Sequence, residues 1–128
     1  MTNAAFRYGQ TQNQTSSRER LMVLLFQAAL RHMRNGAASL ELQRRVEATA
    51  VLNKANDIVL ELHATLDARV APQLAEQLGE IYRFVASRLL SGMMHGDARA
   101  VREAERAFAP LVDAFEQAEA QTRAGARP

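Results

Sequence analysis

The three histidines are the residues best suited to metal binding or acid–base chemistry, but their spacing supports neither. A helical bundle that holds two metal ions uses Glu-x-x-His pairs, in which the carboxylate lies one turn before the imidazole. None of the three histidines has an acidic residue three positions before it. We therefore expect His32 and His63 at the edge of a core, His95 in a loop, and no metal site.

Acidic pairs and nucleophiles do not form a catalytic set either. Asp57 and Glu61 stand four residues apart, a spacing far more typical of a solvated helix face than of an acid–base pair. The chain has no cysteine, and no serine stands in a Gly-x-Ser-x-Gly turn. The sequence therefore predicts no enzymatic activity and no cofactor.

The densest basic cluster consists of four arginines: Arg31, Arg34, Arg44 and Arg45. Glu41 lies among these arginines and Glu47 follows them, and no aromatic residue interleaves with the cluster for base stacking. The net charge of the whole chain is only +2, too weak a field to capture a phosphate backbone. A solvated face is favoured, and nucleic-acid binding stays open as an alternative function.

Length and composition indicate one globular domain. A chain of 128 residues without cysteine can build one modest core that no disulfide stabilises. Met1–Gln14 lacks the apolar stretch of a secretory signal, and the longest apolar run, Leu21–Phe26, is far shorter than the about 20 residues of a membrane span. We expect a cytoplasmic protein without membrane insertion.

Apolar residues recur at helical spacing in four segments. The first follows capping residues Ser16 and Ser17 and carries two adjacent rows: Leu21, Leu25, Ala28 and His32, and Met22, Phe26, Ala29 and Met33. The second carries the row Val51, Ala55, Ile58, Leu62 and Leu66 and ends near Asp67–Val70. We place the turn between these two helices near Glu41–Arg44.

The third helix starts at Pro72, carries the row Leu74, Leu78, Ile81, Val85 and Leu89, and ends near Gly92. The fourth is capped by Asp97, bends at Pro110 and carries the row Val101, Ala104, Phe108, Leu111, Phe115 and Ala118. The prediction is an all-α, antiparallel up-and-down four-helix bundle over residues 17–120. A flexible N-terminal arm (1–16), with Phe6 and Tyr8, precedes it, and a frayed tail (121–128) follows.

Each helix also carries apolar residues beyond its core row. These surplus residues are Met22, Val23, Leu24, Phe26, Leu52, Val59, Leu60, Tyr82, Phe84, Leu90 and Val112. A four-helix bundle cannot bury all of them, and apolar grooves between helices accept the apolar face of a partner helix. The surplus therefore predicts a surface that binds another polypeptide.

The polar and aromatic residues on these helices resemble the FliS family of flagellar export chaperones. The segment Lys54–Asp67 is similar to the family signature Lys-Ala-x-x-Ile-Ile-x-x-Leu-x-x-Thr-Leu-Asp. Leu78, Tyr82, Phe84, Arg88 and Leu89 resemble its next motif, and Thr15–Leu21 its helix entry. Tyr8 matches the tyrosine of the family's N-terminal arm, whereas Gln27 and Ala28 replace a family Asp-Gly pair.

The resemblance implies a cytosolic chaperone that binds the C-terminal segment of flagellin, prevents its premature polymerisation and delivers it to the flagellar type III export gate. The implied partners are that segment and a component of the gate. The residues expected to contact partners are Tyr8, Leu25, Phe26, Ile58, Leu62, Leu66, Tyr82 and Leu90. A regulatory helical bundle and a structural homo-oligomer, in which the surplus rows pair with themselves, remain alternatives.

Overall fold

The chain folds into four long helices, described here from a computed structural model that covers residues 15–126 and the side chains of residues 18–125. The helices are α2 (Thr15–Glu41), α3 (Arg45–Ala64), α4 (Pro72–His95) and α5 (Ala98–Ala126). No strand occurs within the described residues. The predicted all-α four-helix bundle is therefore confirmed. The expected N-terminal arm lies outside the described residues, except for residues 15 and 16, which belong to α2.

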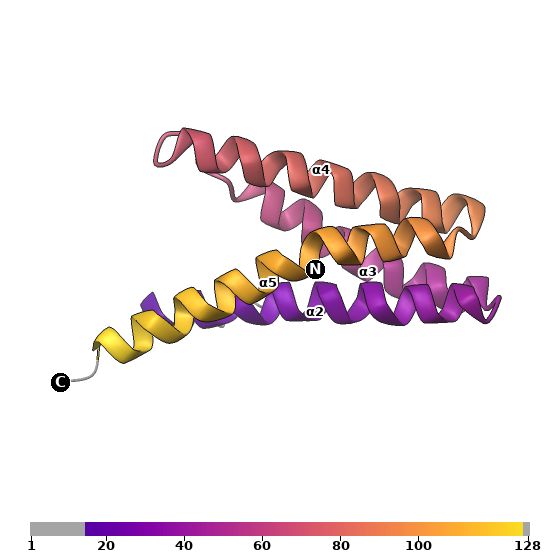
Figure 1. Cartoon of the computed structure of the whole chain (residues 1–128), viewed down its shortest axis with the longest axis horizontal. Helices are drawn as coiled ribbons and strands as arrows, with labels where there is room; N and C mark the ends of the chain where they lie inside the picture. Colours follow the sequence, from indigo (N-terminus) through magenta and orange to yellow (C-terminus); the bar gives the residue numbers. More distant parts are fainter. Residues whose placement is uncertain (1–14, 127–128) are drawn as a thin grey trace.

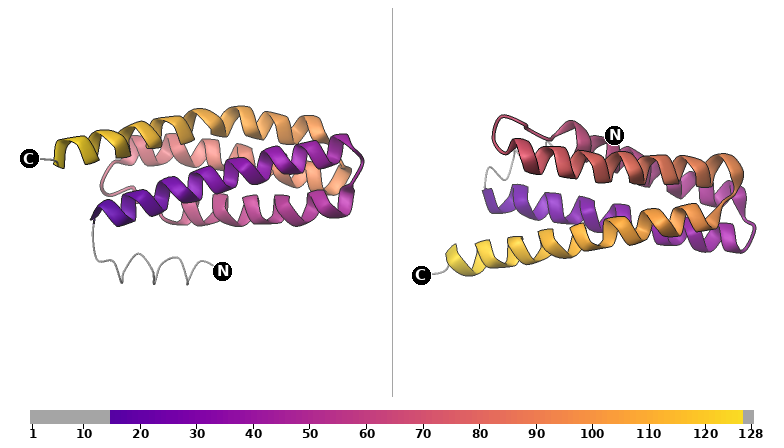
Figure 2. Two further views of the ribbon diagram at one scale, coloured as in Figure 1. Left: turned by 90° about the horizontal axis from the view of Figure 1, so that it is seen from below. Right: turned by 45° about the horizontal axis from the view of Figure 1, so that its top comes forward.

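The four helices alternate in direction along the bundle (Figure 1). α2 packs against α3 and α5, and α4 packs against the same two helices, whereas the diagonal pair α2 and α4 barely meets. The α2–α3 turn and the α4–α5 turn lie at one end of the bundle, and the α3–α4 loop lies at the other (Figure 2). The C-terminal turns of α5 extend past the start of α2, and α5 is helical beyond the expected bundle boundary at residue 120.

The rows that fill the core differ from several of the predicted rows. In α3 the buried residues are Ala48, Leu52, Ala55, Val59 and Leu62. Six of the surplus residues lie in the core: Val23, Phe26, Leu52, Val59, Tyr82 and Val112. Their sequence neighbours Val51, Ile58, Ile81 and Leu111 are only partly buried. In α2 the core uses the second row, with Phe26, Ala29 and Met33 fully buried. The predicted rows were correct for Ala55, Leu62, Leu78, Val85, Leu89, Val101, Ala104 and Phe108, which are buried. They were wrong by one residue at positions such as Ile58 and Ile81, because two adjacent apolar positions lie only about 100° apart around a helix.

Two predicted helix ends were also wrong. α3 ends at Ala64, earlier than expected, because the Thr65 hydroxyl bonds the Leu62 carbonyl at 2.8 Å and the Asp67 carboxylate accepts the Arg69 amide at 2.9 Å. Such local side-chain bonds compete with helix continuation. α4 continues through Gly92, whose missing side chain leaves room for Val101 of α5, and stops at Gly96, which adopts a left-handed φ of 65°.

The expected capping residues Ser16 and Ser17 lie inside α2, which begins at Thr15. The expected α2–α3 turn, the start of α4 at Pro72 and the Asp97 cap agree with the structure. The α2–α3 turn occupies residues 42–44, and the Asp97 carboxylate caps α5 by accepting the Ala100 amide at 3.2 Å. Pro110 lies inside α5, whose ribbon changes direction along its length in Figure 1. The Arg45 guanidinium joins the two turns at one end, because its Nη2 donates to the carbonyls of Met93 and Met94, each at 3.0 Å.

Candidate partner-binding surface

The seam between α2 and α3 has an apolar outer edge. Gly36 lies directly against Leu52, since a Cβ at that glycine would be 2.5 Å from the Leu52 Cγ. On α2, Gly36 belongs to a row at helical spacing that runs back through His32 and Leu25, so this row faces α3. On α3, Ile58 lies along the facing edge and packs partly against the core. Leu25, His32 and Ile58 are each half-buried, so their outer surfaces remain accessible.

The seam between α3 and α4 has a second apolar edge. The rings of His63 and Tyr82 lie 6.1 Å apart, and Gly79 adjoins His63, which fixes the facing edges of the two helices. Leu60 lies three residues before His63, and Leu90 continues the α4 row that begins at Gly79. Leu60 is 50% exposed and Leu90 is 51% exposed. Met94, one turn beyond Leu90, is exposed as well.

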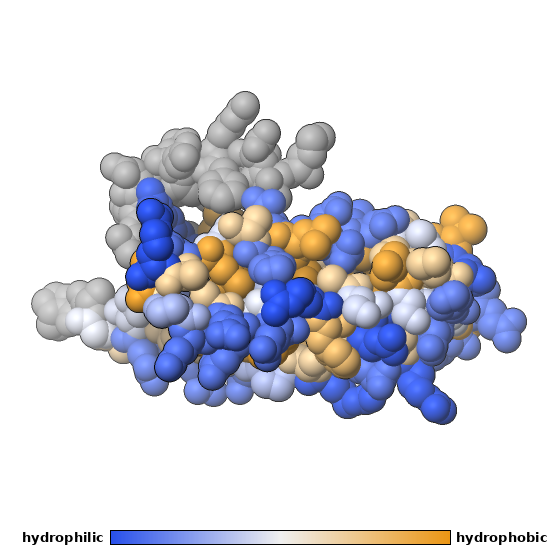
Figure 3. Space-filling view, turned by 90° about the horizontal axis from the view of Figure 1, so that it is seen from above, coloured by the Kyte–Doolittle hydropathy of each residue, from blue (hydrophilic) through white to orange (hydrophobic). Residues whose placement is uncertain are grey.

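These two edges together form a surface that we call the α3 flanks. Leu66 follows α3 and adjoins Gly79 at the α3–α4 seam. The members of the α3 flanks are Leu25, Ile58, Leu60, Leu66, Leu90 and Met94. Figure 3 shows the molecule from the α4 side, with apolar patches interspersed among hydrophilic side chains along its length. Within residues 18–125, the only hydrogen bonds from an α3 side chain to a neighbouring helix are those of Arg45 at its first position. The α3 flanks are therefore apolar surface that no ion pair covers.

The seam between α2 and α5 is instead bridged by ion pairs between arginine and glutamate side chains. The Arg102 guanidinium binds both oxygens of Glu41, at 3.1 and 2.8 Å, and also Glu105 at 2.8 Å. Arg34 reaches Glu105 from α2 at 3.0 Å. Burial alone would raise the pKa of Glu105, but the hydrogen bonds from Arg102 and Arg34 outweigh it and lower that pKa. The hydrogen bond from Arg102 likewise lowers the pKa of Glu41.

Further along the same seam, Glu119 of α5 is 4% exposed and pairs with Arg20 of α2 at 3.3 Å and with Arg123 one turn on. Beneath these charges, the ring of Phe26 stacks on Phe115 at 4.4 Å and on Phe108 at 5.5 Å. Stacked aromatic pairs stabilise a core beyond the area that they bury. The α2–α5 seam thus has an aromatic interior and an ionic exterior.

Two titratable groups next to α3 are affected by burial. Desolvation lowers the pKa of His32 from 6.5, and the charges of Arg31 and Lys54 lower it further. The buried Nδ1 of His32 has no hydrogen-bond partner in the described part of the chain. Burial also raises the pKa of the Tyr82 hydroxyl to about 12. Both side chains are therefore uncharged at neutral pH, so His32 adds no charge at the α2–α3 seam and Tyr82 adds none at the α3–α4 seam.

The structure separates the eight expected contact residues into three groups. Phe26, Leu62 and Tyr82 are 0%, 1% and 2% exposed and belong to the core, where no partner can reach them while the bundle is closed. Leu25, Ile58, Leu66 and Leu90 lie on the α3 flanks. Tyr8 lies outside the described residues.

Sequence reasoning missed one exposed member of this surface and left another out of the contact set. Leu60 was among the surplus residues but was not expected to contact a partner, and Met94 was overlooked. The signal for Met94 was its position four residues after Leu90, which places both side chains on one face of α4.

Residues 15–126 contain no group of three or more histidine or acidic side chains placed to hold a metal ion. None of the four helices is long and apolar enough to span a bilayer.

A comparison with known families identifies the chain. The family model described as flagellar protein FliS matches residues 1–122. This chain belongs to the FliS family. The match covers α2, α3, α4 and α5 up to residue 122, and includes the Lys54–Asp67 signature, which begins on α3, and the motif on α4. A search of curated proteins finds no match.

Membership of the FliS family supports the general role of a flagellar export chaperone, a class of proteins that act by binding other proteins and are not known as enzymes. The α3 flanks agree with such a role, because they offer accessible apolar surface on two adjacent seams. The α2–α5 seam, where the side chains of α2 and α5 already pair with one another, offers less of it.

Proposed function

We propose that this FliS-family protein is a cytoplasmic chaperone that binds the C-terminal segment of flagellin on the α3 flanks. Binding keeps the segment from polymerising early, and the complex is delivered to the flagellar type III export gate. The observation that carries the proposal is the row of accessible apolar side chains on both edges of α3, within a chain that the FliS family model matches over residues 1–122.

The physical chemistry of the α3 flanks suits a segment that folds as it binds. An unassembled helical segment exposes an apolar stripe, and ordering it on binding costs free energy that a long contact surface must offset. Leu25 and Ile58 lie on one edge of α3 and Leu60 and Leu90 on the other, so a segment that crosses α3 can contact both seams. We expect i, i+3, i+4 and i+7 apolar anchors in the client.

The buried members of the expected contact set support this surface from below. Leu62 fills the core beneath Ile58, and Tyr82 packs beside His63 at the α3–α4 seam. Substituting them alters the shape of the α3 flanks through packing, without loss of a direct client contact. Tyr8 remains a proposed contact to the client or to the export gate.

Two titrations test the proposal. Purified protein is titrated by calorimetry with monomeric flagellin and with flagellin that lacks only its C-terminal segment. The intact protein should bind with a negative heat-capacity change, because apolar surface is buried, and the truncated protein should not bind. Equal binding of the two forms would remove the basis of the proposal.

A matched pair of variants locates the surface. Leu25→Glu places a charge on the α2–α3 edge and should weaken flagellin binding by about tenfold or more, because an unpaired carboxylate must be desolvated in the complex. Leu24→Glu makes the same change one residue away, on the outer face of α2, and should leave the affinity unchanged. Equal losses in the two variants, or no loss in either, would place the client elsewhere.

The nucleic-acid alternative is weakened by the arrangement of its four arginines. Arg34 is paired with Glu105, and Arg45 binds the carbonyl oxygens of Met93 and Met94. Two of the four cations are thus already engaged within the bundle.

A further inference from the structure

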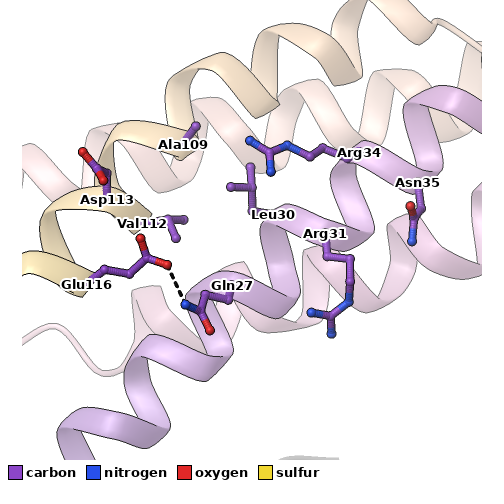
Figure 4. Close-up of a pocket in the computed structure, with 9 residues that line it drawn as sticks. All are labelled: Gln27, Leu30, Arg31, Arg34, Asn35, Ala109, Val112, Asp113 and Glu116. Carbon is purple, nitrogen blue, oxygen red and sulfur yellow. Dashed lines mark hydrogen bonds between the residues drawn. The ribbon is translucent and has the colours of Figure 1, made fainter. Parts of the chain in front are cut away.

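A pocket of about 480 Å³ lies between α2 and α5, on the side of the bundle away from the α3 flanks (Figure 4). Its floor is apolar and includes Leu30 of α2 and Val112 of α5, which are almost fully buried. Charged side chains from both helices line its rim. The pocket is separate from the surface assigned above to the client.

The charged side chains on the pocket rim have opposite signs on the two helices. The charged side chains from α2 are both cations, Arg31 and Arg34, and those from α5 are both anions, Asp113 and Glu116 (Figure 4). Arg34 already pairs with Glu105, and Glu116 already accepts the Gln27 amide at 2.5 Å. One cation and one anion therefore remain on opposite walls.

The remaining pair is Arg31 and Asp113. Arg31 is exposed and makes no ion pair within the described chain. Asp113 accepts only the Gln117 amide of its own helix, at 3.3 Å. The contacts of Gln27 with Glu116 and of Arg34 with Glu105 fix the register of the two helices. This register places Arg31 within about one helical turn, roughly 5 Å along the axis, of the level of Asp113.

A second copy of the chain supplies the missing charges through symmetry. In a two-fold arrangement with the axis parallel to the helices, α2 of each copy lies over α5 of the other, and each residue keeps its level along the axis. Arg31 then faces Asp113 of the second copy, and the reverse contact forms at the same time, as in any isologous interface. Leu30 and Val112 remain almost fully buried at the pocket floor of each copy, so the rim side chains form the contact.

We propose that the α2–α5 face binds a second copy of this chain through reciprocal Arg31–Asp113 pairs. The arrangement of charges favours this partner. Each copy carries a cation, Arg31, on α2 and an anion, Asp113, on α5, so two copies can supply each other's opposite charge. A foreign helix would have to bring both charges itself. Exposed ion pairs around a small apolar floor make a weak, salt-sensitive dimer. Both α3 flanks stay uncovered in it, so client binding and dimer formation are compatible.

Sedimentation velocity on the full chain tests the proposal. The wild-type protein should form dimers between about 10 and about 500 µM in low salt, and should dissociate as salt is raised to about 300 mM. Arg31→Glu and Asp113→Arg should each weaken self-association about tenfold or more, because like charges then face each other twice. A 1:1 mixture of the two variants restores both pairs and should dimerise like the wild type.

Matched controls identify the face. Asp57→Arg on α3 and Arg83→Glu on α4 change the net charge as Asp113→Arg and Arg31→Glu do, and should leave self-association unchanged. Leu90→Glu should also leave the dimer intact. The proposal is overturned if the wild-type protein stays monomeric at the highest concentration. It is also overturned if the mixture of the two variants does not associate, or if Leu90→Glu abolishes the dimer. None of these measurements involves flagellin, so their failure is distinct from a failure of the proposed function.

Discussion

The α2–α5 seam and the α2–α3 seam join the same helix to its two neighbours by different means. Across α2–α5, residues such as Arg20, Gln27 and Arg34 each find an acidic partner on α5. Across α2–α3, the helices approach closely at Gly36 and Leu52, and the described residues form no ion pair there. Charge pairs specify the register of one seam, whereas close packing specifies the other. The seam without charge pairs is the one that offers apolar surface to a partner.

The largest effect is expected from breaking the close approach on the α2–α3 seam. In Gly36→Val, the new side chain would overlap that of Leu52, and overpacking of this kind costs about 1–3 kcal/mol. Gly125→Val is the matched control, since nothing lies within 4 Å of a Cβ at that glycine. Urea unfolding at two salt concentrations should show a salt-independent loss for Gly36→Val. A loss that disappears in high salt would mean that charge also governs this seam.

A smaller and salt-dependent effect is expected from the α2–α5 seam. Arg102→Met removes the contacts to Glu41 and Glu105 and should lower the free energy of unfolding by about 1 kcal/mol in low salt, because exposed ion-pair networks contribute modestly. The loss should shrink in about 1 M salt, where charges are screened. Arg106→Met, which changes an exposed arginine of the same helix, serves as the control and should unfold like the wild type. The same loss in both variants would show that the network stabilises nothing.

The smallest effect concerns His32, at the α2–α3 edge. Its folded-state pKa lies below 6.5, because burial and the charges of Arg31 and Lys54 disfavour the imidazolium. Between the folded and unfolded pKa values the unfolded chain binds more protons, so the contribution of His32 to stability is complete above pH 6.5 and is lost as the pH falls through the folded-state pKa. An NMR titration, assigned with His32→Gln, should give a midpoint below 6.5. A midpoint above that value would contradict the burial described here.

The sequence was sufficient for the number of helices and for most of their ends, but not for their rotation about their own axes. Apolar side chains stand on two adjacent rows at pairs such as Val51–Leu52, Ile58–Val59 and Ile81–Tyr82. The helical spacing of apolar residues is the same for both rows, so it does not tell which row is buried. The choice depends on which row faces the centre of the bundle. That is a property of all four helices together, so a single helix does not reveal it.

The same ambiguity explains the contact residues. Leu25 and Ile58 lie beside the core and are partly exposed, whereas Leu62, from the same predicted row as Ile58, and Tyr82 proved to be core residues. The ion pairs across α2–α5 were not foreseen, since residues such as Arg20 and Glu119 are far apart in the sequence. The early end of α3 at Ala64 depends on the local hydrogen bonds of Thr65 and Asp67, which compete with the helical pattern.

The contact of Arg45 with the last carbonyls of α4 has a consequence for how the bundle opens. It ties the α2–α3 turn to the α4–α5 turn, and each of these turns holds one residue at positive φ, Gln43 and Gly96. At the opposite end, residues 65–71 connect α3 to α4 without such a tie. Local opening starts where backbone hydrogen bonds have the least tertiary support. Amide hydrogens near Ala64 and Pro72 should therefore exchange with solvent sooner than those beside Arg45.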